Sequence, residues 1–429
     1  MRIAFVNNNY QYGGAERVVQ QLHSACRKAG HRSRLYVDRL HLYGWSHFPW
    51  GQAVRPLYPL VLQRFWWHPR LGPRIRARFP RAQWTDRRFR ALARTRADLV
   101  HVHSFHGDYA TVQSLAHVAE RRIAIWTFHG YWGITGGCVN PYGCRRYNDA
   151  CGSCPQVGGW NIGPIDRTAD ELERKLRLLA PLPLHVIVPS RHMAKTVRES
   201  RVGGRWTVHH IPNGVDPGQF GFTRKGEPAF RASLGFDPHA TVVLVVNRDF
   251  RDVPKGFPVI ARALSCIDPR GVQVVLVGHH ADWAARQITA RMPCHAVGYA
   301  EDRSRLAALH EAGDIVLFAS AGENFPCAIL EAMAAQCCVV STPTDGVLEQ
   351  IENGRSGIIA TDLSSESLGT ALAGALAHPD SARAYGKTAR ERVVTLFTEE
   401  RMITRHLRLY ASLVARRGKT PRRDFGSES

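Results

Sequence analysis

The stretch Gly322–Ala334 reads GENFPCAILEAMA and carries two glutamates, Glu323 and Glu331, eight residues apart. The apolar, alanine-rich part from Ala328 onward predicts a helix, and Asn324-Phe325-Pro326 precedes it as a turn. Glu331 then lies in an early turn of the helix and Glu323 in the loop before it. Both carboxylates can face one ligand over the helix N-terminus, accepting hydrogen bonds from sugar hydroxyls while the helix attracts phosphate. A solvated loop acid beside a helix-surface acid is the alternative.

This stretch belongs to a regular alternation of short apolar strands and helices. In the second half of the chain, strands are predicted at Thr241–Val246, Gln273–Val277, Ile315–Phe318 and Val339–Ser341, with helices near Val259–Cys266, Arg303–Glu311, Ala328–Gln336 and Ser365–Ala377. In the first half, strands are predicted at Ile3–Val6, Ser33–Val37, Leu99–Val102, Ile123–Phe128 and His185–Val188. Short β-branched runs of this kind are typical of strands covered on both faces. The sequence therefore predicts an α/β protein with two Rossmann-like doubly wound domains that face a cleft.

The domain boundary is predicted at Ile211–Pro217, IPNGVDP, which is rich in turn-forming residues. The expected organisation is an N-terminal domain over residues 1–212, a C-terminal domain over 213–381, a helical segment over 382–414, and a basic, frayed tail over 415–429. Ser190 is expected to cap the helix that follows the last strand of the first domain.

In each domain the loop after the first strand carries candidate ligand-binding residues, glycines in the first domain and basic residues in the second. Asn7–Val19, NNNYQYGGAERVV, has Gly13-Gly14 where strand turns into helix, so backbone N–H groups can approach an anion; a simple tight turn is the alternative. The loop lacks the GxGxxG pattern, so it does not predict a dinucleotide site. Val245–Phe257, VVNRDFRDVPKGF, places Arg248 and Lys255 where a diphosphate would bind at the carboxyl edge of the sheet. Ordinary surface charge is the alternative there.

At these places the chain resembles the retaining family 4 glycosyltransferases of the GT-B fold, over roughly residues 1–415. The family's E-x7-E element is matched by Glu323 and Glu331, its donor diphosphate site by Arg248 and Lys255-Gly256, its first loop by Gly13-Gly14, and its inner-strand histidine by His129 in WTFHG. The PNGVD sequence at the linker is also typical of this family.

The resemblance implies a role for each matched residue. Glu331 would bind the ribose of a nucleotide-sugar, and Arg248 with Lys255 its diphosphate. Glu323 and His129 would act on the transferred sugar, with Asn324, Phe325 and Pro326 beside the donor and Gly13-Gly14 on the acceptor or phosphate side. No cofactor is expected for catalysis. The terminal helical segment would cross back to the first domain.

The net charge of +21 favours phosphate-rich partners. It is concentrated in Arg64–Arg96, RFWWHPRLGPRIRARFPRAQWTDRRFRALARTR, where arginines alternate with aromatic residues, a composition suited to an anionic membrane surface. A solvated helical face with some buried aromatics is the alternative. No run of about 18 apolar residues and no signal-peptide pattern is present. A cytoplasmic location, peripheral at the inner face of the cell membrane, is therefore expected.

Four cysteines lie within the loop-like stretch Gly136–Gln156, GGCVNPYGCRRYNDACGSCPQ. These are Cys138, Cys144, Cys151 and Cys154, spaced C-x5-C-x6-C-x2-C, and the CxxC end predicts a structural zinc site. Redox or disulfide chemistry and no joint role are the alternatives; a reducing cytosol disfavours disulfides. The insert resembles one in some bacterial exopolysaccharide glycosyltransferases. Because it begins just after His129, it is expected at the cleft mouth on the acceptor side.

The sequence thus predicts a glycosyltransferase that uses a nucleotide-sugar donor and a saccharide acceptor, the latter polyprenyl-diphosphate-linked, in exopolysaccharide or surface-glycan synthesis. A zinc-stapled nucleic-acid-binding protein is an alternative suggested by the charge and cysteines, although it leaves Glu323 and Glu331 unexplained, and no specific nucleic acid is expected as a partner. A GT-B epimerase or an inactive homologue is a third possibility.

Overall fold

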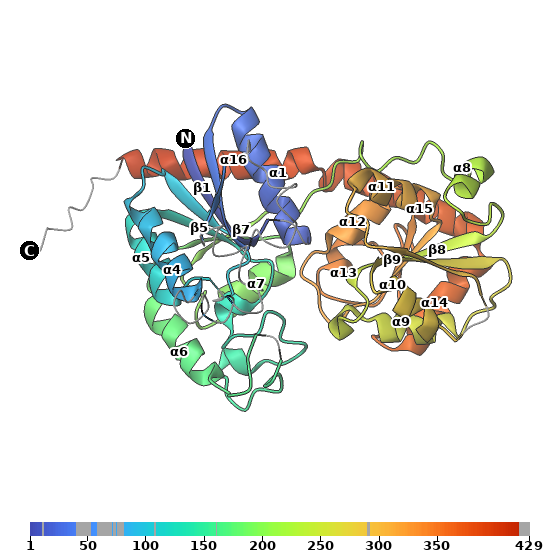
Figure 1. The fold of residues 1–429 in the computed structure, drawn as a ribbon, viewed down its shortest axis with the longest axis horizontal. Coiled ribbons are helices and arrows are strands. Elements are labelled where there is room, and N and C mark those ends of the chain that lie inside the picture. The colour runs from blue at the N-terminus through green and yellow to red at the C-terminus, as the bar shows by residue number, and fades with distance from the viewer. Residues whose placement is uncertain are drawn as a thin grey trace, which may run out of the picture.

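The computed structural model describes residues 1–10, 13–39, 53–57, 71, 74, 81–106, 109–159, 161–289 and 292–419. These residues form two lobes, each built on a parallel sheet with helices on both faces (Figure 1). The expected fold class, two doubly wound α/β domains, is confirmed.

The first domain has a seven-stranded sheet of order β3-β2-β1-β4-β5-β6-β7. Its strands are β1 Arg2–Asn9, β2 Arg32–Arg39, β3 Val54–Pro56, β4 Leu99–Val102, β5 Ile123–Thr127, β6 His185–Val188 and β7 Thr207–His210. Its helices are α1 Gly14–Lys28, α4 Arg81–Ala91, α5 Val112–Arg121, α6 Thr168–Leu178 and α7 Arg191–Glu199. As expected, Ser190 caps α7: its hydroxyl accepts a hydrogen bond from the N–H of Met193 at 3.0 Å.

The second domain has a six-stranded sheet of order β10-β9-β8-β11-β12-β13. Its strands are β8 Thr241–Asp249, β9 Val272–His279, β10 Cys294–Gly298, β11 Ile315–Phe318, β12 Cys338–Ser341 and β13 Ile358–Ile359. Its helices are α8 Pro228–Ser233, α9 Phe257–Leu264, α10 Ala281–Gln287, α11 Arg303–Ala312, α12 Cys327–Ala334, α13 Val347–Gln350, α14 Ser365–Ala377 and α15 Pro379–Leu396. In both sheets the first strand of the domain lies centrally, which brings its βα loop to the middle of the carboxyl edge.

The chain returns to the first domain through two helices rather than one continuous helical segment. α15 packs on α12 and β12 of the second domain, whereas α16, Glu399–Lys419, packs on α1 of the first. Figure 1 shows α16 lying along the first lobe. The helix breaks at Phe397-Thr398, where Thr398 pairs with Val215 of the linker, so both crossings between the domains run side by side. The tail expected from residue 415 begins later, because α16 continues to Lys419.

Residues 64–70, 72–73 and 75–80 of the basic, aromatic stretch Arg64–Arg96 lie outside the described residues. Within its described part, Phe89 is fully buried in the core and Trp84 is half-buried, while Arg87 and Arg88 are exposed. Of the described aromatic rings in this stretch, that of Phe89 belongs to the core of the first domain. None of the described helices combines the length and apolar content that crossing a bilayer requires.

Candidate active site

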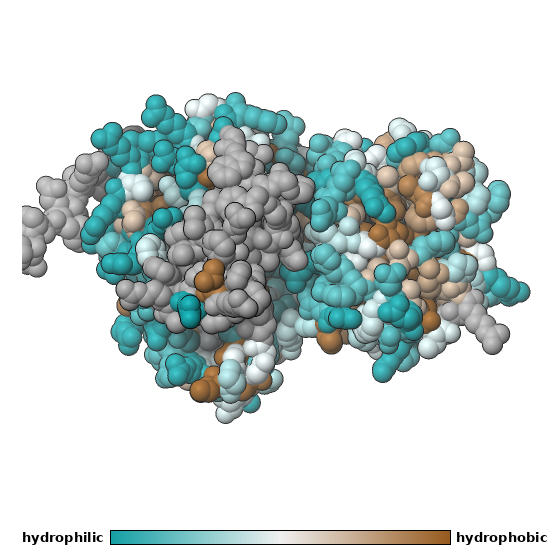
Figure 2. Space-filling view, viewed as in Figure 1, coloured by the Kyte–Doolittle hydropathy of each residue, from teal (hydrophilic) through white to brown (hydrophobic). Residues whose placement is uncertain are grey.

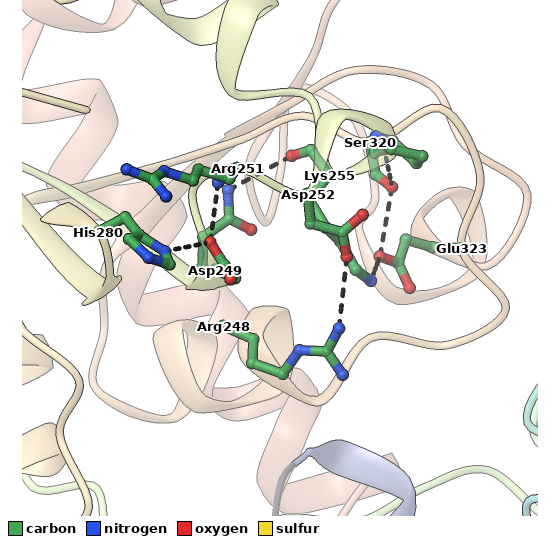
Figure 3. A network of polar contacts seen from close by, with 10 residues as sticks. Arg248, Asp249, Arg251, Asp252, Lys255, His280, Ser320 and Glu323 are labelled. Atoms are coloured by element: carbon green, nitrogen blue, oxygen red, sulfur yellow. Dashed lines mark hydrogen bonds and ion pairs between the residues drawn. The ribbon is translucent and has the colours of Figure 1, made fainter. Parts of the chain in front are cut away.

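Lys255 and Glu323 meet at the carboxyl edge of the second sheet. The Lys255 ammonium lies 2.6 Å from Oε1 of Glu323, which also accepts a hydrogen bond from the Ser320 hydroxyl at 3.3 Å (Figure 3). Gly256 follows with φ 74°, and a Cβ there would lie 2.6 Å from the Ala319 carbonyl oxygen, so only glycine fits this turn. The turn fixes Lys255 beside the loop that carries Glu323.

Arg248 leaves the end of β8 toward the same loop. It is half exposed and makes a loose ion pair with Asp252, with 3.5 Å between Nη2 and Oδ2. The neighbouring Arg251 points away, on the side where Asp249 bonds His280 at 2.8 Å (Figure 3). Of these two arginines, Arg248 is therefore the one that lies on the side of Lys255 (Figure 3).

Glu331 lies in the second turn of α12 and is 3% exposed. Its carboxylate forms ion pairs with Arg17 from α1 of the first domain and, at 3.7 Å, with Arg303 from the start of α11. Two guanidinium groups thus converge on one buried carboxylate. The first of these pairs joins the two domains directly.

The glycine pair of the first domain faces the start of α12. A Cβ on Gly14 would lie 3.4 Å from the sulfur of Cys327, the first residue of α12, so the N-termini of α1 and α12 approach each other. Gly13 stands at the N-cap of α1. Burial raises the pKa of Glu16 in this first turn, and the positive charge of Arg248 in the second domain acts against that rise.

His129 follows β5, with Nε2 3.0 Å from Nδ1 of the buried His103. Burial lowers the pKa of His129 to about 3, so its imidazole is neutral near pH 7. The preceding Phe128 carbonyl accepts a hydrogen bond from Asn324 at 2.9 Å. The β5 end and the loop of Glu323 therefore touch across the domain boundary.

The turn before α12 is held mainly by protein contacts. The amide oxygen of Asn324 accepts a hydrogen bond from the Ser190 hydroxyl at 2.7 Å, so both ends of this side chain bind the first domain. The carbonyl of Phe325 accepts from Asn213 of the linker at 2.9 Å, and that of Pro326 from Gln350 at 3.0 Å. Asn324 thus docks the two domains, a role that the sequence did not reveal.

The structure brings the four cysteines together around one cavity, which is also lined by Gly136 and Gly137. None of them is in a disulfide. Within the part of the chain that the structure describes, no three His, Cys, Asp or Glu side chains are arranged to hold a metal ion. The cysteine loop, defined as Gly136–Gln156, also reaches the second domain through Asn140, whose side chain lies against Gly322.

Sequence reasoning missed the first-domain residues that complete the site, Arg17 and Asn140. Arg17 follows directly on the glycine loop, and its position one turn from Gly13 was the available indication. Figure 2 shows that the part of the second domain nearest the first is mostly hydrophilic in this view.

Two facing parallel-sheet domains with the site between them define the GT-B fold. The family described as Glycosyltransferase Family 4 matches residues 12–219, and the family described as Glycosyl transferases group 1 matches residues 226–392. The chain therefore belongs to the GT-B glycosyltransferases, with a family 4 domain followed by a group 1 domain. This result favours the glycosyltransferase interpretation over the nucleic-acid-binding one.

Named relatives agree with this assignment. WcaC of Escherichia coli K12, whose name places it in colanic acid biosynthesis as a glycosyl transferase, is 23% identical over 76% of this chain and 79% of its own length. Sucrose-phosphate synthase from Thermosynechococcus elongatus has a similar structure, with a TM-score of 0.73 at 20% identity over 97% of this chain and 99% of that one. HepE of Anabaena, solved with UDP and glucose, has a TM-score of 0.66 at 18% identity over 96% and 100%.

Proposed function

We propose that the protein is a retaining glycosyltransferase that moves a sugar from a nucleoside diphosphate sugar to a saccharide acceptor carried on a polyprenyl diphosphate. The observation that carries this proposal is the pair formed by Lys255 and Glu323, with Arg248 beside it, at the carboxyl edge of the second sheet. Two cations suit a departing diphosphate, and a carboxylate suits sugar hydroxyls. The UDP and sugar named for the HepE structures support a nucleotide-sugar donor.

In the proposed reaction the bond between the anomeric carbon and the diphosphate oxygen breaks, and its electron pair stays with the diphosphate. The acceptor hydroxyl attacks from the same face, and its proton passes to the leaving diphosphate oxygen. Lys255 and Arg248 stabilise the charge that develops there, which is the largest contribution expected of the protein. Without a donor, Lys255 is paired with Glu323, so donor binding must turn the ammonium toward the diphosphate and free the carboxylate for the sugar.

Glu331 and His129 complete the proposed donor site. Glu331 binds the ribose hydroxyls, and its pairing with Arg17 of the first domain links nucleotide binding to domain closure. His129, neutral because it is buried, offers a ring nitrogen to a sugar hydroxyl without adding charge. Asn324 contributes by holding the two domains at the distance that brings these groups together.

The acceptor and location are proposed from the relatives and the charge. The name of WcaC supports exopolysaccharide or surface-glycan synthesis. A basic chain of net charge +21 would be attracted to the anionic inner face of the cell membrane, where lipid-linked acceptors are found.

A donor screen with the purified protein tests this proposal. UDP-, GDP- and ADP-sugars are each incubated with an oligosaccharide diphosphate lipid, and the product's anomeric configuration is read by NMR. We expect transfer from one donor class with retention, and loss of transfer in Glu323→Gln. An inverted product, or donor binding with epimerisation and no transfer, would refute it. Flotation with anionic vesicles at low salt tests the membrane association separately.

A further inference from the structure

The four-cysteine cluster, Cys138, Cys144, Cys151 and Cys154, surrounds a single small space. The shared cavity has a volume of about 20 Å³, which is room for about one water molecule. All four side chains are half-buried free thiols. Residues up to sixteen positions apart in the sequence therefore line one cavity of the cysteine loop.

One backbone N–H group is directed at a sulfur of the cluster. The N–H of Gln156 donates to the sulfur of Cys154 at 3.5 Å. Backbone N–H groups directed at sulfur commonly surround metal thiolates, because they share the negative charge. The turn itself is pinned by Asp166, whose carboxylate accepts from the N–H of Cys154 at 2.7 Å.

The buried Lys175 of α6 lies beside Thr135, just before the start of the cysteine loop. The ammonium of Lys175 is fully buried, donates to the carbonyls of Trp132 and Thr135 at 2.5 and 2.8 Å, and lies 3.5 Å from the centre of a Trp132 ring. Burial lowers the pKa of Lys175 to about 7, and negative charge on Glu171, Cys138 and Cys151 acts against that lowering. A zinc ion with four thiolates carries two negative charges, so a buried ammonium beside it is compensated.

We propose that the four-cysteine cluster binds one zinc ion through four thiolates, and that this structural ion holds Asn140 against the loop of Glu323. The thiols surround the cavity without the convergence of a formed metal site, so metal binding must draw them inward. Gly143 and Gly152, both with positive φ, give the backbone the freedom for this adjustment. The four thiol protons pass to solvent as zinc binds.

The consequence for the cleft follows from the path of the loop. The carbonyl of Asn140, two residues after Cys138, accepts from the Gln156 side chain at 2.9 Å, and Gln156 is two residues after Cys154. The Asn140 side chain lies so close to Gly322 that a Cβ there would be 2.4 Å from its amide nitrogen. Asn140, which touches the donor loop immediately before Glu323, is thus connected to two cysteines of the cluster, to Cys138 along the chain and to Cys154 through Gln156. This part of the inference rests on the proposed function.

Metal analysis of the full chain, purified under reducing conditions without chelator, tests the site. We expect one zinc per chain in the wild type and in Cys266→Ser, whose thiol is exposed and distant, and loss of zinc in the double variant Cys144→Ser with Cys154→Ser. Should that variant fail to fold, cobalt(II) reconstitution of the wild type decides the matter, because four thiolates give strong sulfur-to-cobalt absorption. Zinc-free wild type that cannot be reconstituted, or a disulfide count that accounts for these thiols, would overturn the proposal.

The variant Asn140→Ala tests the contact with the donor loop separately from zinc binding. This variant should keep its zinc and its melting temperature but lose at least tenfold in transfer rate. Gln287→Ala, which changes an exposed side chain at the C-terminal end of α10, should keep all three. Full activity in Asn140→Ala would refute the link to the donor loop while leaving the metal result to stand on its own. If no donor supports transfer at all, the metal content still tests the site independently of the proposed function.

Discussion

Glu331→Gln tests the buried carboxylate that joins the domains. The substitution keeps the shape of the side chain but removes its charge, leaving the guanidinium groups of Arg17 and Arg303 facing each other. Removing one partner of a fully buried ion pair costs about 3–5 kcal/mol. Here Glu331 is 4% exposed at its side chain but the arginines are 27% and 29% exposed, so water relieves part of the penalty. We expect a loss of about 1–3 kcal/mol of unfolding free energy, which lies between the buried and surface values.

The same change should weaken nucleotide binding. If the carboxylate accepts the ribose hydroxyls, losing a charged hydrogen bond costs about 1.5–3 kcal/mol, which is roughly a 10- to 150-fold higher Kd. The assay is calorimetric titration with whichever of UDP, GDP or ADP the wild type binds best, accompanied by urea unfolding. Glu391→Gln, an exposed carboxylate on α15, is the matched control and should change neither quantity. Wild-type affinity in Glu331→Gln would refute the ribose assignment, and unchanged unfolding would refute the energetic role of the ion pairs.

Three further outcomes are expected. Lys255→Met should lower kcat/KM in the transfer assay on the order of 10²–10³-fold, because it removes a cation from the leaving diphosphate. The control Arg262→Met removes an exposed cation and should leave kcat/KM unchanged. Equal losses in both variants would mean that net charge, not the position of Lys255, sets the rate. Burial lowers the pKa of His406 from 6.5 to about 4, so the unfolded chain takes up a proton below about pH 6.5 that the folded protein does not. The free energy of unfolding should therefore be full above about pH 6.5 and fall by up to about 1.4 kcal/mol per pH unit down to pH 4. In urea unfolding at pH 7 and pH 5, His406→Leu should lose less stability than the wild type, and an identical loss would contradict the lowered pKa of His406. Asn324→Ala removes the hydrogen bond to Phe128 across the domain boundary and should increase the radius of gyration measured by small-angle scattering, with no change counting against its docking role.

The strands found from the sequence and the strands missed differ in their position in the sheets. Every predicted strand lies inside a sheet, where burial on both faces demands an uninterrupted apolar run. The four missed strands, β3, β7, β10 and β13, are the outer strands of the two sheets. β7 reads TVHH and is only partly buried, so it has no such run. An edge strand forms because it pairs with one neighbouring strand, and the local sequence gives no sign of that pairing.

The return of the chain shows the same limit at the level of domains. A helical pattern runs through Phe397-Thr398, and local preference alone predicts one helical segment there. In the structure the ring of Phe397 packs on Phe325 with 5.5 Å between centroids, and Thr398 pairs with Val215. These contacts come from residues far apart in the sequence, and they end one helix and begin another.

The sequence by itself determined the two α/β domains, the linker, and the loops that carry Lys255, Glu323 and the four cysteines. Each of these follows from residue types and spacings within a few turns of chain. Only the tertiary structure decided that Glu331 is held by Arg17, that Asn324 docks the domains, and that Asn140 lies on Gly322. The physical reason is that these contacts form between two separately folded sheets, so their partners are chosen by the packing of the domains and not by any local pattern.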